Sequence, residues 1–251
     1  MPIQKSAYDI EARKIFLYGK PKTGKSTFAS HMKGAYFVST EAGLDFLKTK
    51  NTVIRSWPDF IKFLGRIEAK PELIESSRCF IVDTVDRLYT LCYAHVMKEL
   101  NIREPRQNNY GKDWKILRNE WEANVNRLLT LGKGVLFIGH CKEIEVSIED
   151  EALKDVTVPG YISAIPMSGR EFILTTVDFA WCADQVTQTE KVDGKKTKKT
   201  RPYIFTKPSD RYPDCGFRLD IFPEKVPLNY KDITAVYNTG IKKVLSERGI
   251  V

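Results

Sequence analysis

The amino-acid sequence predicts a doubly wound α/β fold with a mainly parallel sheet. Two observations lead to this prediction. Short apolar strands alternate with helical segments along most of the chain, and several of these strands are apolar at every position. A continuous apolar strand is typical of a parallel sheet that helices cover on both faces. In such a sheet the ligand site lies at the carboxyl ends of the strands.

The predicted elements follow one another in a regular order. Apolar runs predict strands at residues 15–18, 35–39, 51–56, 78–84, 135–140 and 178–183. Helical spacing of apolar residues predicts helices at residues 26–32, 57–67, 85–100, 114–131, 169–176 and 230–249. Right-handed crossovers through these helices would keep the strands parallel.

Two segments depart from this alternation. Residues 186–191 and 197–206 are predicted to form a β-hairpin, because Asp193-Gly194 between them favours a tight turn. Residues 141–168 are polar and partly acidic, and we expect a long functional or mobile connection there. We expect a single domain over residues 1–251, with a core at about 13–212 and a C-terminal extension at 213–251.

The composition is that of a globular protein with a basic surface. The chain has 251 residues and a formal net charge of +8, which permits a polyanionic partner. Its apolar runs are too short to span a bilayer, so we expect a cytoplasmic protein without a membrane partner. Part of the positive charge is concentrated in Lys195, Lys196, Lys198, Lys199 and Arg201. This basic run is either a polyanion contact or a solvated hairpin tip.

A glycine-rich motif directly follows the first predicted strand and opens the first helix. Its spacing is G-x-x-x-x-G-K-[ST], which is that of a phosphate-binding loop. Inward-facing backbone N–H groups of such a loop bind the phosphates of a nucleoside triphosphate, and the lysine adds positive charge. We therefore predict ATP binding by the motif and the residue after it: Gly19, Lys20, Pro21, Lys22, Thr23, Gly24, Lys25, Ser26 and Thr27.

The motif also predicts a magnesium site. The Ser26 hydroxyl stands where a phosphate-binding loop supplies a Mg²⁺ ligand. Asp83 ends the apolar strand 78–84 and is the expected second ligand, the Walker B acid. The alternative for Asp83 is a cap of the following helix, and this is compatible with metal binding.

Two more polar residues stand at predicted strand ends. Glu41 follows the strand 35–39 and is a candidate general base that orients water for ATP hydrolysis. Its alternative role is an acid in the first turn of a helix. His140 ends the strand 135–140 and could donate a hydrogen bond to the γ-phosphate, or it could be a structural histidine.

The order of these motifs resembles that of the RecA-like core ATPases. More narrowly, the chain is similar to phage-encoded members of the AAA-type P-loop family that act as single-strand annealing or recombination proteins. The resemblance spans about residues 13–212 and depends on the phosphate-binding loop, Glu41, Asp83 and His140. It implies a RecA-like core and a catalytic role for Lys25 together with these three residues.

The resemblance also implies partners. It implies a homo-oligomer, a ring or a filament, in which a basic finger reaches the neighbouring site, and this finger maps to Lys207 and Arg211. It implies single-stranded DNA as a ligand, with Arg103, Arg106, Lys112 and the basic run as contacts, and a single-strand-binding protein as a further partner. The expected function is Mg²⁺-dependent ATP hydrolysis in recombination, annealing or replication in the host cytoplasm.

Two other functions stay open at this point. A nucleotide or metabolite kinase would also carry the phosphate-binding loop, although the sequence shows no convincing arginine-rich lid, and Glu41 suits water activation better than acceptor binding. The second is an ATP-gated regulatory or assembly protein with a protein partner. Acceptor-dependent phosphate transfer would indicate the kinase.

Overall fold

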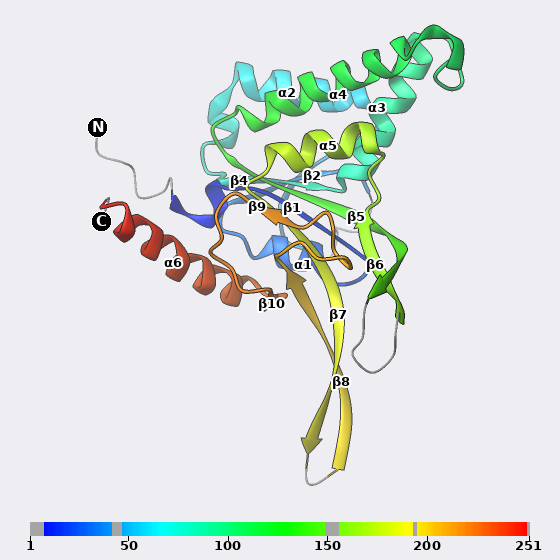
Figure 1. Ribbon diagram of the computed structural model, residues 1–251. Helices are drawn as coiled ribbons and strands as arrows, with labels where there is room; N and C mark the ends of the chain where they lie inside the picture. Colours follow the sequence, from blue (N-terminus) through cyan, green and yellow to red (C-terminus); the bar gives the residue numbers. More distant parts are fainter. Residues whose placement is uncertain (1–7, 42–46, 149–155, 193–194, 250–251) are drawn as a thin grey trace.

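A computed structural model of the chain has a central sheet covered by helices on both faces (Figure 1). It describes residues 8–41, 47–148, 156–192 and 195–249. The predicted α/β class with a large, mainly parallel sheet is confirmed. The Asp193-Gly194 turn of the predicted hairpin lies outside the described residues.

The parallel part of the sheet has the strand order β7-β1-β5-β4-β2-β3. These strands are β1 (Lys14–Gly19), β2 (Ala35–Ser39), β3 (Lys50–Val53), β4 (Cys79–Asp83), β5 (Gly134–Ile148) and β7 (Phe179–Val192). The antiparallel strands are β6 (Val156–Ser163), β8 (Lys195–Phe205), β9 (Gly216–Phe217) and β10 (Lys225–Pro227). All six predicted core strands are present.

Helices form a layer on each face of the sheet (Figure 1). One face carries α2 (Trp57–Ala69), α3 (Val85–Glu99), α4 (Lys112–Leu129) and α5 (Met167–Thr176), and the other carries α1 (Lys25–Ser30) and α6 (Tyr230–Glu247). The side chains of β1 alternate between the two layers: Phe16 and Tyr18 join the first core, and Ile15 and Leu17 join the second. Every one of these four is buried, so β1 lies at the centre of the domain.

The interpretation of residues 141–168 as an irregular connection is wrong. β5 continues past His140 to Ile148 and pairs in antiparallel fashion with β6. This β5–β6 hairpin follows a period-two pattern, in which Ile144 and Val146 alternate with Glu143 and Glu145. Because the hairpin is half-exposed, polar side chains alternate with apolar ones, and the segment lacks the continuous apolar run that predicted the other strands.

The predicted strand at 178–183 and the first arm of the predicted hairpin are one element. β7 runs without interruption from the parallel sheet into an antiparallel ladder with β8. The outer part of this ladder, residues 185–192 and 195–202, extends beyond the rest of the molecule (Figure 1) and is called the arm below. The arm begins two residues after Ala183, where the pairing of β7 with β1 ends.

The C-terminal extension packs onto the sheet. β10 pairs with β8, and four side chains of α6 are buried in the same core as Ile15 and Leu17 of β1. These side chains are Ile233, Tyr237, Ile241 and Leu245. Within the described part of the chain, no helix is both long and apolar enough to cross a lipid bilayer.

Candidate nucleotide site

The polar residues at the predicted strand ends meet at one edge of the sheet. Gly19 at the end of β1 is in register with His140 on β5. Ser39 at the end of β2 is in register with Asp83 at the end of β4. Because these four strands are parallel and adjacent, the residues that follow them surround a single region.

The glycine-rich loop connects β1 to α1, as the motif predicted. Gly19 lies against β7: a Cβ atom there would stand 2.2 Å from the carbonyl oxygen of Ala183, so no other residue fits without moving the backbone. Gly24 has a φ of +98°, in the left-handed region that favours glycine, and it is the N-cap residue directly before α1. The two glycines therefore allow the tight turn that directs the loop N–H groups inward.

Lys25 lies at the centre of the loop. Its side chain is buried, and its Nζ donates to the carbonyl oxygens of Gly19 at 2.9 Å and Lys20 at 2.7 Å. Burial lowers the pKa of Lys25, while nearby acidic groups, Asp83 among them, oppose this shift. A desolvated ammonium held inside the loop can transfer its hydrogen bonds to phosphate oxygens.

The other loop residues differ in exposure. Thr23 is buried and donates from Oγ1 to the carbonyl oxygen of Lys20 at 3.0 Å, which closes the turn. Ser26 and Gly24 are half-buried, whereas the exposed positions are Lys20, Pro21, Lys22 and Thr27. The loop therefore has a fixed inner side and an accessible outer side.

Ser26 and Asp83 fit the predicted magnesium site. Their side chains interact, although they are 57 positions apart on α1 and β4. Burial raises the pKa of Asp83, and the interaction with the Ser26 hydroxyl opposes this shift. A hydroxyl and a carboxylate are oxygen donors of the kind Mg²⁺ binds. A cation here would offset the burial of the Asp83 charge.

Glu41 follows β2 and faces the end of β4. Its Oε1 accepts a hydrogen bond of 3.1 Å from Thr84 Oγ1. The neighbouring Thr40 joins the same two strands, because its Oγ1 accepts from the backbone N–H of Thr84 at 2.9 Å. Glu41 is exposed and lies outside any helix, so its carboxylate is accessible to water.

His140 forms a pair with an acid that sequence analysis did not identify. Asp86 Oδ2 lies 2.9 Å from His140 Nδ1, and Asp86 Oδ1 accepts from the backbone N–H of His140 at 3.0 Å. Ligand atoms of Glu41, Asp86 and His140 all lie within 4.8 Å of one another. The hydrogen bond to Asp86 raises the pKa of His140, although partial burial opposes the shift. Asp86 therefore favours the protonated form of His140 beside Glu41.

The two residues of the predicted finger both contact other residues of the same chain. Lys207 forms a salt bridge with Asp220, with 2.9 Å between Nζ and Oδ1. Arg211 donates from Nε to the carbonyl oxygen of Pro159 at 3.1 Å, and its guanidinium is 4.0 Å from Asp184. Asp214, three positions further along the chain, contacts Arg170 instead.

Arg211 shares a cavity of about 380 Å³ with the outer side of its own phosphate-binding loop. The cavity is lined by Lys20, Pro21, Tyr161 and Asp184 among others. Lys20 contacts the β5–β6 hairpin here: its Nζ is 3.3 Å from Glu143 Oε2 and 4.6 Å from the centre of the Tyr161 ring. Hydrogen bonding to Tyr161 and Glu143 raises the pKa of Lys20 to about 12.

The fold and the loop together define a P-loop nucleotide-binding protein. A model of the AAA domain family matches residues 11–213, and the chain belongs to this family. The resemblance to AAA-type P-loop ATPases is thus confirmed, and it implies nucleotide binding.

A search of curated proteins adds a more distant relative. Over 140 residues the chain is 28% identical to the SPbeta prophage-derived uncharacterized protein YorG of Bacillus subtilis (strain 168). The aligned part covers 55% of this chain and 43% of that protein, so it spans less than half of the relative's length.

Proposed function

We propose that this protein is a Mg²⁺-dependent ATPase that binds single-stranded DNA and assists recombination, annealing or replication. The observation that carries the ATPase part is the meeting of five side chains at one edge of the sheet: Lys25, Ser26, Glu41, Asp83 and His140. Together they offer the groups that phosphate-bond hydrolysis needs.

In this proposal the residues divide the work. Lys25 binds the phosphates, and Ser26 with Asp83 holds Mg²⁺, which neutralises charge on the phosphate oxygens. Glu41 orients a water molecule and accepts its proton. His140, whose pKa Asp86 raises, donates a hydrogen bond toward the γ-phosphate.

A second cavity supports a nucleotide rather than a simple polyphosphate as the ligand. A space of about 470 Å³ adjoins the start of α1 and is lined by Phe28, His31, Leu228 and Tyr230 among others. It also borders Thr23 and Gly24 of the loop. A base and ribose in this cavity would have their phosphates directed into the loop.

The proposal of DNA binding depends on the arm. Lys198 and Lys199 on β8 are exposed, and they belong to the basic run of the sequence. A projecting two-stranded ribbon can lie along a strand of phosphates and neutralise them. We also propose that the protein acts as a homo-oligomer in which Arg211 or Lys207 of one protomer completes the site of the next.

The direct test is ATP turnover measured with single-stranded DNA, with duplex DNA and with no polymer. We expect Mg²⁺-dependent phosphate release that single-stranded DNA stimulates most. Turnover that requires a small-molecule phosphate acceptor would instead indicate a kinase. Turnover that no DNA changes, together with no DNA binding, would favour a regulatory ATPase with a protein partner.

A further inference from the structure

The junction of α3 and α4 projects past the rest of its helical layer (Figure 1). This junction, residues 101–118, is called the tip below. Its surface carries two large aromatic side chains: Tyr110 is 97% exposed and Trp114 is 45% exposed. Tyr110 and Trp114 are four positions apart at one end of the molecule, and exposed aromatic side chains gathered in one place indicate an interaction surface.

The tip is held in one conformation by a buried acid. Asp113 accepts two hydrogen bonds from the Arg106 guanidinium, at 2.8 and 3.0 Å, and one from the Arg106 backbone N–H at 2.8 Å. These bonds from Arg106 lower the pKa of Asp113 to about 2, so the pair stays charged at neutral pH. Tyr110 and Trp114 are therefore presented by a braced turn.

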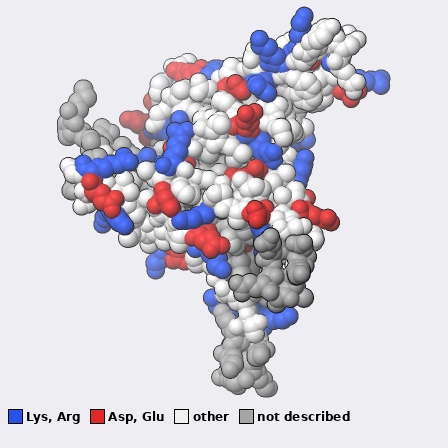
Figure 2. Space-filling view, in the orientation of Figure 1, with Lys and Arg blue, Asp and Glu red and all other residues white. Residues whose placement is uncertain are grey.

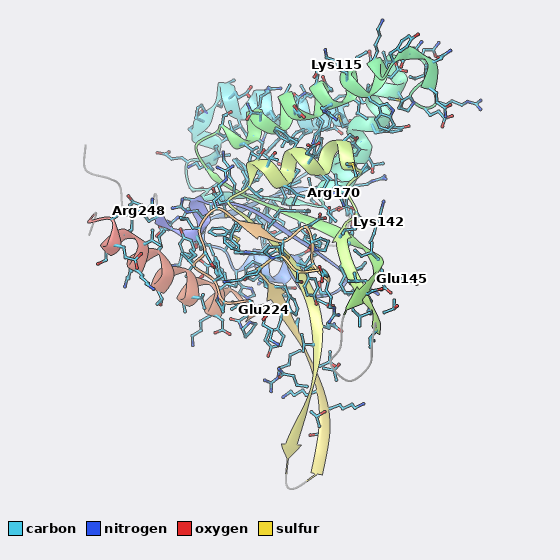
Figure 3. All side chains as sticks on the ribbon, in the orientation of Figure 1. Lys115, Lys142, Glu145, Arg170, Glu224 and Arg248 are labelled. Carbon is cyan, nitrogen blue, oxygen red and sulfur yellow. The ribbon has the colours of Figure 1, made fainter. Side chains whose placement is uncertain are left out.

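The tip is also strongly basic. Figure 2 shows blue side chains flanking the white surface at this end of the molecule. Within the described part of the chain, no salt bridge involves Arg103, Lys112, Lys115 or Arg118, and all four are exposed. Lys115, labelled in Figure 3, lies on α4 within the tip. Trp114 and Arg118 are four residues apart on α4 and share a face of the helix.

We propose that the tip binds single-stranded nucleic acid by stacking bases on Tyr110 and Trp114. Cations without a salt-bridge partner bind the phosphates on either side of the stacked bases. The combination of an aromatic platform with surrounding positive charge favours this occupant over a protein segment. Bases in a duplex already stack on one another, so the aromatic rings select single strands.

This inference deepens the proposed DNA binding and does not depend on ATP hydrolysis. The tip and the arm lie at opposite ends of the molecule (Figure 1). The arm offers phosphate contacts, whereas the tip adds contacts with the bases themselves. The two surfaces can therefore be tested separately.

Tryptophan fluorescence provides the experiment, because Trp114 is the one exposed tryptophan. Trp57, Trp121 and Trp181 are all 1% exposed or less. The probes are an oligo-dT strand and an abasic strand of equal length, whose binding is also followed by anisotropy of an end label. We expect oligo-dT to quench the wild-type emission, the abasic strand to leave it nearly unchanged, and Trp114→Phe to abolish the quenching.

Tyr110→Ala is the matched binding variant, since its side chain contacts solvent and its removal creates no cavity. We expect it to weaken oligo-dT binding about fivefold to a hundredfold, as for the removal of one stacked base, and to leave binding of the abasic strand unchanged. Ile116→Ala, at an exposed apolar position on the same helix, is the control and should bind as the wild type does.

Three outcomes would overturn the proposal. If oligo-dT binds by anisotropy but neither quenches Trp114 nor depends on Tyr110, the stacking site is absent while DNA binding elsewhere stands. If no strand binds at all, the tip proposal and the DNA part of the proposed function both fail. If the emission changes only with protein concentration, the tip is a self-association surface.

Discussion

Asp86 binds His140 through both of its carboxylate oxygens, one to the ring Nδ1 at 2.9 Å and one to the backbone N–H at 3.0 Å. The pair joins the first turn of α3 to the sheet edge beside the phosphate-binding loop. Burial disfavours the charged carboxylate of Asp86, but the hydrogen bonds with His140 outweigh it and lower the pKa of Asp86. Each residue of the pair therefore favours the charged form of the other: Asp86 raises the pKa of His140, and His140 lowers the pKa of Asp86.

The first prediction concerns this pair. In the wild type the raised pKa of His140 keeps the imidazolium present above its ordinary value of 6.5, and the charge is lost as the pH rises through the raised pKa. Asp86→Asn removes the partner charge, so the pKa of His140 falls. We expect the alkaline loss of ATP turnover to move to lower pH, measured as kcat against pH.

An NMR titration of the histidine ring protons provides the control, because the chain has 3 histidines and His31 and His95 lie elsewhere. Only the His140 titration should shift in Asp86→Asn. An unchanged pH profile together with an unchanged His140 pKa would show that Asp86 does not set the protonation of His140.

The second prediction concerns Lys25. Lys25→Ala removes the buried ammonium at the centre of the loop, so ATP affinity should fall and turnover should drop about a hundredfold or more. A fluorescent ATP analogue measures the first effect and phosphate release the second. Lys62→Ala, at an exposed position on α2 away from the loop, is the control, and wild-type turnover by folded Lys25→Ala would contradict the assignment.

The third prediction separates Glu41 from Asp83. Glu41→Gln keeps the size and polarity of the side chain but removes the base, so we expect normal ATP binding and turnover lower by about 10²–10⁴-fold. Asp83→Asn should instead raise the Mg²⁺ concentration needed for half-maximal turnover. Binding and turnover measured across a Mg²⁺ series distinguish the two, and wild-type hydrolysis by Glu41→Gln would place the base elsewhere.

The fourth prediction concerns the basic run of the arm. Replacing Lys195, Lys196, Lys198 and Lys199 by Ala should weaken single-strand binding and flatten the dependence of log K on log salt. The slope should fall by about 0.7 for each phosphate that the variant no longer neutralises. Replacing Lys242 and Lys243 of α6 by Ala is the control for a general change in charge. Equal slopes for the arm variant and the wild type would mean that the lysines of the basic run are solvated and do not contact DNA phosphates.

The fifth prediction tests whether a neighbouring protomer completes the site. Arg211→Ala subunits retain the phosphate-binding loop, and Lys25→Ala subunits retain Arg211. Each alone should be nearly inactive, whereas their mixture should regain turnover, since a finger of this kind contributes about 10³-fold or more. Turnover per wild-type subunit should also rise with protein concentration. A mixture that stays inactive would leave Arg211 to its contacts with Pro159 and Asp184 of its own chain.

The parallel core could be predicted because its strands carry an unambiguous signal. Residues 79–82 and 135–138 are apolar at every position, and all of them are buried between the two helical layers. The phosphate-binding loop was equally clear, because two glycines and a lysine at fixed spacing satisfy one backbone geometry. The meeting of Glu41, Asp83 and His140 then followed from the rule that parallel strands end at a common edge.

Other features had no comparable signal. The β5–β6 hairpin is half-exposed, so its acidic side chains suggested a loop although Ile144 and Val146 recur with the period of a strand. Asp86 stands 54 residues before His140, and in the sequence it resembles any acid in the first turn of a helix. Only the register of β5 beside β4 brings the two together.

The continuity of β7 makes the arm a lever. A single strand runs from Phe179, beside β1, through Ala183, against which Gly19 is packed without room for a Cβ atom, and out to Val192. From Ala183 to Val192 the strand extends about 30 Å. β7 is fixed at its contact with Gly19. A tilt of β7 about this contact that is too small to break its pairing with β1 would therefore displace the far end of the arm by a larger distance.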